Sequence, residues 1–201
     1  MEYPSEIIRE LISQLVKIPG IGQRSALRIV LNLLKQSRED TEALAENIIK
    51  LKTSIRYCKK CQGISDDESC KICSDHTRDC SQVCVVEDIR DVIAIENTHQ
   101  YKGLYYVLGG LISPVEGVGP ADLNLHLLQE RAEKEKLSEI IFALNATIEG
   151  DTTMFYIARM LSPYHIKMSA LSRGISIGGE LEYADEVTLG RSLVNRTSYS
   201  I

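Results

Sequence analysis

Four cysteines stand in two Cys-x-x-Cys pairs, and their spacing is typical of a metal site. The pairs are Cys58/Cys61 and Cys70/Cys73, with eight residues between them. Each pair places two thiolates on one tight turn, so two such turns supply the four soft ligands of a closed tetrahedral Zn²⁺ site. A zinc ion with four protein ligands has no open position for a substrate, and the spacing therefore predicts a structural zinc. The alternative is four free thiols or two disulfides.

The segment that joins the two pairs, residues 62–69, has too few apolar groups to form a core of its own, so we expect its fold to depend on the metal. His76 lies close enough to Cys73 to compete as a zinc ligand. The remaining cysteines, Cys80 and Cys84, precede an apolar run, where we expect both to pack as small hydrophobic groups.

Three acidic residues follow apolar runs that have the character of strands. Glu87 comes directly after Val83–Val86, and Glu149 and Asp151 follow the run Ile140–Leu144. Because the carboxyl ends of neighbouring parallel strands meet at one edge of a sheet, these carboxylates are expected to converge. Clustered carboxylates favour Mg²⁺, a hard cation that takes oxygen ligands. The alternative is that the last two acids only stabilise the first turn of a helix.

A glycine-rich hairpin near the amino terminus has the chemistry of a phosphate site. Gly20 and Gly22 leave backbone N–H groups bare, and the helix that follows directs its positive end at the same place. Arg24 and Arg28 lie one helical turn apart just after the hairpin and add positive charge on one face. The hairpin is therefore predicted to contact DNA without reading base sequence. The alternative is an ordinary turn between two helices.

Apolar periodicity indicates the elements that position these residues. The amino-terminal segment predicts two helices around the hairpin, then a third that begins with Ser37 and Asp40 as a capping box and carries Leu44, Ile48 and Leu51 on one face. Beyond the cysteines, apolar runs alternate with helical stretches, which predicts an α/β domain with a mainly parallel sheet. The expected strands are Val83–Val86, Leu104–Leu108, Ile140–Leu144 and Ile166–Leu171, and the expected helices include Ala121–Lys136 and Thr152–Leu161.

Charge is divided unevenly along the 201 residues, whose net charge is -5. Residues 1–60 carry 11 Lys and Arg against 7 Asp and Glu, whereas residues 61–201 carry 12 against 21. Any contact with phosphates is therefore expected from the first part of the chain.

The amino terminus and the cysteines favour a cytoplasmic protein. Residues 1–6 are acidic where a signal peptide would be basic, and thiolates reserved for zinc suit a reducing compartment. No stretch approaches the roughly 18 to 20 apolar residues that a bilayer-spanning helix needs, so no membrane partner is expected.

The acids resemble the signature of the Toprim domain of topoisomerases, primases and certain nucleases, with Glu-x-Asp at Glu149 and Asp151 where that signature has Asp-x-Asp. The order of hairpin, four-cysteine module, Toprim-like domain and carboxyl-terminal segment Ser172–Asp185 resembles the RecR family of bacterial recombination mediators over nearly the whole chain. The resemblance implies a helix-hairpin-helix domain at residues 1–53, a four-cysteine zinc finger at 54–78, a Toprim domain at 79–175 and an oligomerisation segment at 176–201.

The same resemblance implies a non-enzymatic role with no catalytic residues. Members of the family act with RecO and RecF to help load the RecA recombinase onto single-stranded DNA coated by single-strand-binding protein. They associate into homo-oligomers, either dimers or tetrameric rings, that clamp DNA. The basic residues after the hairpin fall on Arg24 and Arg28, and the surface around Glu87, Glu149 and Asp151 receives RecO. The alternative function is a Toprim nuclease that holds Mg²⁺ on those three acids.

Overall fold

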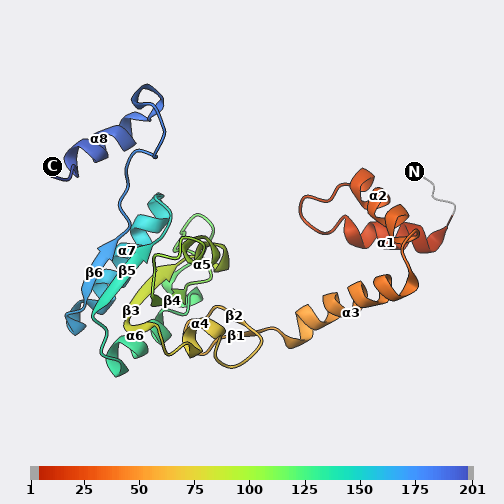
Figure 1. Ribbon diagram of the computed structural model, residues 1–201, viewed down its shortest axis with the longest axis horizontal. Helices are drawn as coiled ribbons and strands as arrows, with labels where there is room; N and C mark the ends of the chain where they lie inside the picture. The colour runs from red at the N-terminus through yellow and green to blue at the C-terminus, as the bar shows by residue number, and fades with distance from the viewer. Residues whose placement is uncertain (1–4, 199–201) are drawn as a thin grey trace. The chain divides into compact units, whose positions relative to one another are not determined.

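The computed structural model describes residues 5–198, which form two compact units that divide between Ile55 and Arg56 (Figure 1). Within the described residues, no helix is both long and apolar enough to span a membrane.

The first unit consists of three helices, α1 (Glu6–Leu15), α2 (Gln23–Leu33) and α3 (Arg38–Ser54). Helices α1 and α2 pack through Ile12, Ala26 and Val30, which are almost completely buried. Helix α3 begins as predicted after Ser37, whose hydroxyl accepts a hydrogen bond from the Asp40 amide at 3.1 Å. The carboxylate of Asp40 accepts from the same hydroxyl at 2.7 Å and not from the Ser37 backbone N–H, so only half of the predicted capping box is formed.

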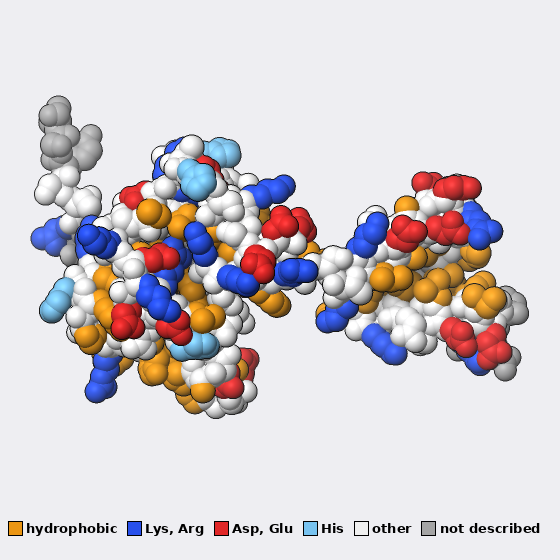
Figure 2. All heavy atoms as spheres, turned by 90° about the horizontal axis from the view of Figure 1, so that it is seen from below, with side chains coloured by type: hydrophobic (Ala, Val, Ile, Leu, Met, Phe, Trp, Pro, Cys, Tyr) orange, Lys and Arg blue, Asp and Glu red, His pale blue; other side chains and the backbone are white. Residues whose placement is uncertain are grey.

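Helix α3 buries none of its residues within the described chain. The predicted apolar face of Leu44, Ile48 and Leu51 is present, but these side chains are 46%, 61% and 65% exposed. Hydrophobic side chains reach the surface of the helical unit in the space-filling view (Figure 2). The first unit therefore leaves an apolar face without a partner among the described residues.

The second unit starts with a small module that carries the cysteine pairs. Its strands β1 (Arg56–Tyr57) and β2 (Ile64–Ser65) pair antiparallel, and the short helix α4 (Lys71–Ser74) follows. Three of the cysteines, Cys58, Cys61 and Cys73, are buried in this module together with Gly63 and Ser65, and they take the place of a hydrophobic core of larger side chains.

A four-stranded parallel sheet follows, which confirms the predicted fold class. Its strands are β3 (Asp79–Val86), β4 (Gly103–Val107), β5 (Glu139–Ala143) and β6 (Lys167–Ala170), in the order β4-β3-β5-β6. Along β3, Val83 and Val85 point into one core and Cys84 and Val86 into the other, because successive side chains in a strand face opposite sides.

Helices cover both cores. Helices α6 (Leu125–Lys134) and α7 (Ile148–Leu161) supply side chains to the larger core, and α5 (Ile89–Glu96) packs Val92 into the smaller one (Figure 1). Helix α6 is shorter than predicted because a 3₁₀ turn, Pro120–Asp122, precedes it. Helix α7 begins at Ile148 rather than at Thr152, because the Thr147 side chain caps it by accepting from the Gly150 amide at 3.1 Å. A second 3₁₀ turn, Ser162–Tyr164, follows α7.

Two contacts join the outer side of strand β4 to its surroundings. The Val107 amide donates to the Cys61 carbonyl at 2.8 Å, which ties the cysteine module to the sheet. The buried guanidinium of Arg131 donates to the Tyr105 carbonyl at 3.3 Å. Strand β4 is an end strand of the sheet, so these contacts lie on the side that faces no other described strand.

The chain ends in a loop-rich segment after β6. It contains a 3₁₀ turn at Leu181–Tyr183 and the helix α8 (Glu186–Val194). Helix α8 buries no residue within the described part of the chain, and Ile177, Tyr183 and Val194 before and within it are 105%, 80% and 78% exposed.

Candidate metal centre, DNA-binding hairpin and acidic edge

The four cysteines form one compact cluster. The sulfur atoms of Cys58, Cys61, Cys70 and Cys73 all lie within 4.8 Å of one another, and those of Cys61 and Cys70 are 3.6 Å apart. Four sulfurs at about 2.3 Å from a central zinc are separated by roughly 3.8 Å, so the cluster fits a tetrahedral ion. His76 is exposed and lies outside this cluster, so it does not compete as a ligand.

The four thiols lie close enough to influence one another's ionisation. The hydrogen bond between Cys61 and Cys70 raises the pKa of Cys61 to about 12 and lowers that of Cys70. Hydrogen bonds with the same two thiols raise the pKa of Cys73 as well. Four adjacent thiolates therefore form at neutral pH only when a positive ion compensates them. Backbone amides assist: Cys70 donates to the Cys58 sulfur at 3.3 Å and Cys73 to the Cys70 sulfur at 3.4 Å.

The hairpin between α1 and α2 has an open backbone. Gly20 adopts a φ of +84°, in the left-handed region that favours glycine, and Gly22 caps α2. A Cβ atom at either position would meet no described atom within 4 Å, so both glycines face open space. No side chain in the described residues caps the first turn of α2. Its backbone N–H groups are consequently available to an anion.

Arg24 and Arg28 are exposed and form no ion pair with any residue from 5 to 198. Together with Leu31 and Lys35 they line a shallow groove of about 340 Å³ along α2. Lys35 was not predicted, although its spacing of seven residues from Arg28 corresponds to two helical turns and indicates the same face. The result is a basic stripe that begins at the open hairpin.

The acidic edge contains two of the three predicted carboxylates. Glu87 follows β3, Glu149 lies in the first turn of α7, and both line a hollow of about 640 Å³ at the carboxyl ends of the strands. Asn145 follows β5 in the same hollow, and its amide donates to Glu87 at 2.9 Å.

Asp151, the third predicted carboxylate, does not line this hollow. It forms a bidentate ion pair with Arg173, one contact of which is 3.2 Å, and this hydrogen bonding lowers the pKa of Asp151. Within residues 5–198, the carboxylates of Glu87, Glu149 and Asp151 do not form a group compact enough to hold a metal, whereas the cysteines do. Neither Asn145 nor Arg173 was predicted from the sequence. No local pattern marks Arg173, which lies 22 residues from its partner.

Four family models match the chain in sequence order. They describe a RecR helix-hairpin-helix (residues 8–52), a RecR zinc finger domain with four cysteines (55–75), a Toprim domain (81–172) and a RecR C-terminal region (174–197). Recombination protein RecR of Bacteroides thetaiotaomicron is 53% identical over 199 residues, which cover 99% of this chain and 97% of the relative. The chain belongs to the RecR family.

Two further relatives, both named recombination protein RecR, are similar to nearly the whole chain. RecR of Amoebophilus asiaticus is 54% identical over 99% of this chain and 100% of its own length, and RecR of Cytophaga hutchinsonii is 52% identical over 99% and 98%. The resemblance predicted from the sequence is confirmed.

The RecR zinc-finger match and the sulfur cluster together confirm the predicted structural zinc, with Cys58, Cys61, Cys70 and Cys73 as the residues that fit it. When bound, the zinc ion would neutralise the four thiolates and hold the two cysteine turns of the module together.

Proposed function

We propose that this RecR-family chain is a non-enzymatic recombination mediator that clamps DNA as a homo-oligomer in the cytoplasm. In this role it acts with RecO and RecF to help load RecA onto single-stranded DNA coated by single-strand-binding protein. The observation that carries the proposal is the open hairpin with its adjoining basic stripe. Bare amides and the guanidinium groups of Arg24 and Arg28, which no described carboxylate pairs, suit phosphates of any base sequence.

We further propose four functional parts with the limits 1–53, 54–78, 79–175 and 176–201, whose outermost residues 1–4 and 199–201 lie outside the described chain. The first part binds DNA, the second holds zinc, the third receives a partner and the fourth associates subunits. Exposed apolar side chains on α3 and around α8 support association, because a second subunit would remove them from water. A measurement of molecular size in solution distinguishes a dimer from a tetrameric ring.

The acidic edge is proposed to bind the basic partner RecO. Glu87 and Glu149 form no ion pair within residues 5–198, and their hollow opens at the strand ends. Residues 61–201 carry 12 Lys and Arg against 21 Asp and Glu, so this part of the chain repels DNA and attracts basic surfaces. Mg²⁺ bound by Glu87 and Glu149 is the competing role for the same carboxylates.

Changing Arg24 and Arg28 together to Ala is expected to weaken DNA binding similarly for all base sequences. Each lost phosphate contact reduces the slope of log affinity against log salt by about 0.7 on single strands and about 0.9 on duplexes. Fluorescence anisotropy over a salt series measures both quantities. Arg38→Ala is the matched control, because Arg38 is an exposed arginine of the same unit that is already paired with Glu42 at 2.7 Å.

An unchanged affinity and salt slope in a folded Arg24/Arg28 double variant would contradict the proposed DNA contact.

The nuclease alternative is tested on the same labelled DNA, which is recovered after incubation with Mg²⁺ and run on a denaturing gel. Intact DNA supports a mediator, whereas cleavage that Glu87→Gln abolishes would replace it with the Toprim nuclease.

Reversing the charge of Glu149 with Lys is expected to lower the affinity for RecO about tenfold, and more at low salt, where charge contacts are least screened. Affinity is measured by titration calorimetry at two salt concentrations. Glu133→Lys makes the same charge change on an exposed part of α6 and should bind RecO normally. Equal loss in both variants would show a general charge effect and count against a RecO site at the acidic edge.

A further inference from the structure

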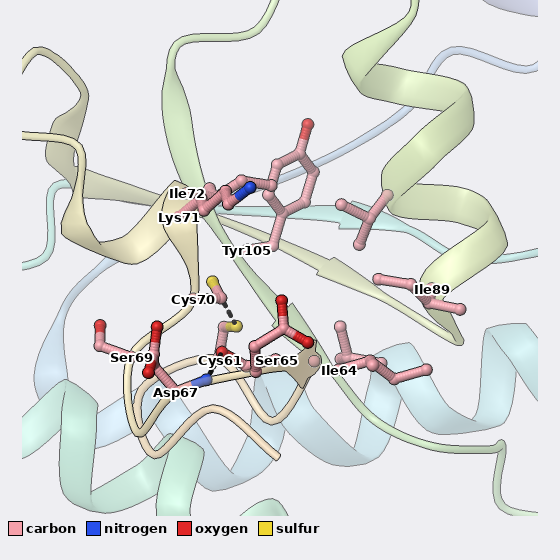
Figure 3. Close-up of a pocket in the computed structure, with 14 residues that line it drawn as sticks. Cys61, Ile64, Ser65, Asp67, Ser69, Cys70, Lys71, Ile72, Ile89 and Tyr105 are labelled. Atoms are coloured by element: carbon pink, nitrogen blue, oxygen red, sulfur yellow. Dashed lines mark hydrogen bonds between the residues drawn. The ribbon is translucent and has the colours of Figure 1, made fainter. Parts of the chain in front are cut away.

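A pocket of about 290 Å³ lies where the cysteine module meets the sheet and α5 (Figure 3). Ile72, Ile89, Val92 and Tyr105 supply much of its apolar wall, and Cys61 and Cys70 also line it. The DNA-binding hairpin and the acidic edge use none of these side chains. The pocket therefore provides a route from solvent to the metal ligands that the proposed function does not require.

The pocket distinguishes two of the four cysteines. Cys58 and Cys73 do not line it, whereas Cys61 and Cys70 do, one from each Cys-x-x-Cys pair. Their sulfur atoms lie 3.6 Å apart, and the close-up shows them directed at each other (Figure 3). Cys70 is half-buried, while Cys61 is only 4% exposed. An approaching molecule would consequently meet Cys70 first, with the second sulfur immediately behind it.

We propose that Cys70 is an oxidation site for small uncharged peroxides that enter through this pocket, with Cys61 as its resolving partner. The Cys70 thiolate attacks hydrogen peroxide, an S–O bond forms, the O–O bond breaks, and hydroxide leaves. The Cys61 thiolate then attacks the Cys70 sulfenic acid, an S–S bond forms, the S–O bond breaks, and a second hydroxide leaves. The two thiolates lose two electrons in total, and the peroxide gains them.

The geometry suits this pair. A disulfide has an S–S length of about 2.05 Å, so the two sulfurs, now 3.6 Å apart, need to approach by roughly 1.5 Å as the bond forms. A zinc ion that loses two of its four thiolates is no longer held in a closed site and dissociates. The pocket is small, and Asp66 and Asp67 in its wall repel anions, so it admits an uncharged peroxide more readily than a bulky or anionic reagent.

The first test uses zinc-loaded protein with Cys80→Ser, which removes an exposed thiol outside the cluster. Hydrogen peroxide is added, released zinc is followed with a coloured chelator, and the products are mapped by mass spectrometry. A sulfenic-acid trap is expected to label Cys70 first, and zinc release is expected to coincide with a Cys61–Cys70 disulfide. Initial labelling of another ligand, or a different first disulfide, would overturn the proposal.

The second test asks whether the pocket is the route. Ile89→Trp fills the pocket from α5, while Ile93→Trp places the same side chain on the same helix at a residue that is 54% exposed and does not line it. Both variants are used only after zinc content shows that the module is intact. Filling the pocket is expected to slow zinc release about tenfold, because access controls thiolate reactivity. Equal rates in the two variants would show that peroxide arrives by another path, and the mass-spectrometric mapping of the first test still decides which cysteine reacts.

Discussion

Replacing Cys58 with Ser is expected to abolish zinc binding and unfold the cysteine module. Cys58 is fully buried, its amide donates to the Gly63 carbonyl at 2.8 Å, and its sulfur accepts from Cys70. The cysteines take the place of a hydrophobic core in the module, so its folding free energy is the free energy of metal binding, about 10–16 kcal/mol for structural zinc in small modules. Zinc content by atomic emission should fall from one ion per chain to none, with a lower melting temperature for the second unit.

Cys80→Ser is the matched control. Cys80 lies near the start of β3, is exposed, and is not part of the sulfur cluster. This variant should keep its zinc and its melting temperature. Full zinc occupancy in Cys58→Ser would contradict the assignment of Cys58 as a ligand.

Gly150→Ala is expected to be among the most destabilising single methyl additions in the chain. Gly150 lies between Glu149 and Asp151 in the first turn of α7, and a Cβ atom there would be 2.0 Å from the Asn145 carbonyl oxygen. A backbone oxygen cannot rotate away like a side chain, so the loop from β5 to α7 must shift. We expect a loss of about 3 kcal/mol or more in the free energy of unfolding, measured by urea denaturation.

Gly190→Ala provides the comparison for Gly150. Gly190 is also in a helix, α8, but a Cβ atom there would meet no described atom within 4 Å. Alanine should be tolerated or slightly favoured, because glycine costs roughly 0.5–1 kcal/mol relative to alanine inside a helix. Similar stability of the two variants would contradict the close approach at Gly150. The middle position of the Glu-x-Asp sequence therefore requires glycine, because the backbone that positions Glu149 passes too close to Asn145 for a Cβ atom.

Local patterns in the sequence were sufficient to predict the strands of the sheet and the cluster of metal-ligating cysteines. Strands such as Val83–Val86 are buried on both faces, so they are continuous apolar runs that turn residues and helices interrupt. The cysteines predict their own proximity, because each short pair fixes two sulfurs on a turn. These predictions needed no knowledge of distant contacts.

Predictions that depended on distant partners were less complete. Cys80 was expected to pack like Cys84, but β3 begins at Asp79 and its first residues project beyond the buried part of the sheet, so that prediction is wrong for Cys80. Asp151 was expected to join the other acids, and only the folded chain shows that Arg173 pairs with it. Contacts of this kind depend on loop paths, which residue periodicity does not describe.

The third helix shows a different limit. The periodicity of Leu44, Ile48 and Leu51 correctly indicates an amphipathic helix, yet the pattern does not say what covers its apolar face. The described chain leaves that face exposed. An amphipathic pattern specifies which side of a helix is to be buried, whereas the partner depends on the assembly.

The hydrogen bond from the Val107 amide to the Cys61 carbonyl means that the zinc module covers part of an end strand of the sheet. Strand β4 ends the sheet, and an uncovered end strand offers a row of unpaired amides and carbonyls to any extended segment of another molecule. The module and Arg131 occupy groups in that row. Chains that lose the metal would expose a template for intermolecular strand pairing, so zinc supply during synthesis would limit aggregation as well as folding.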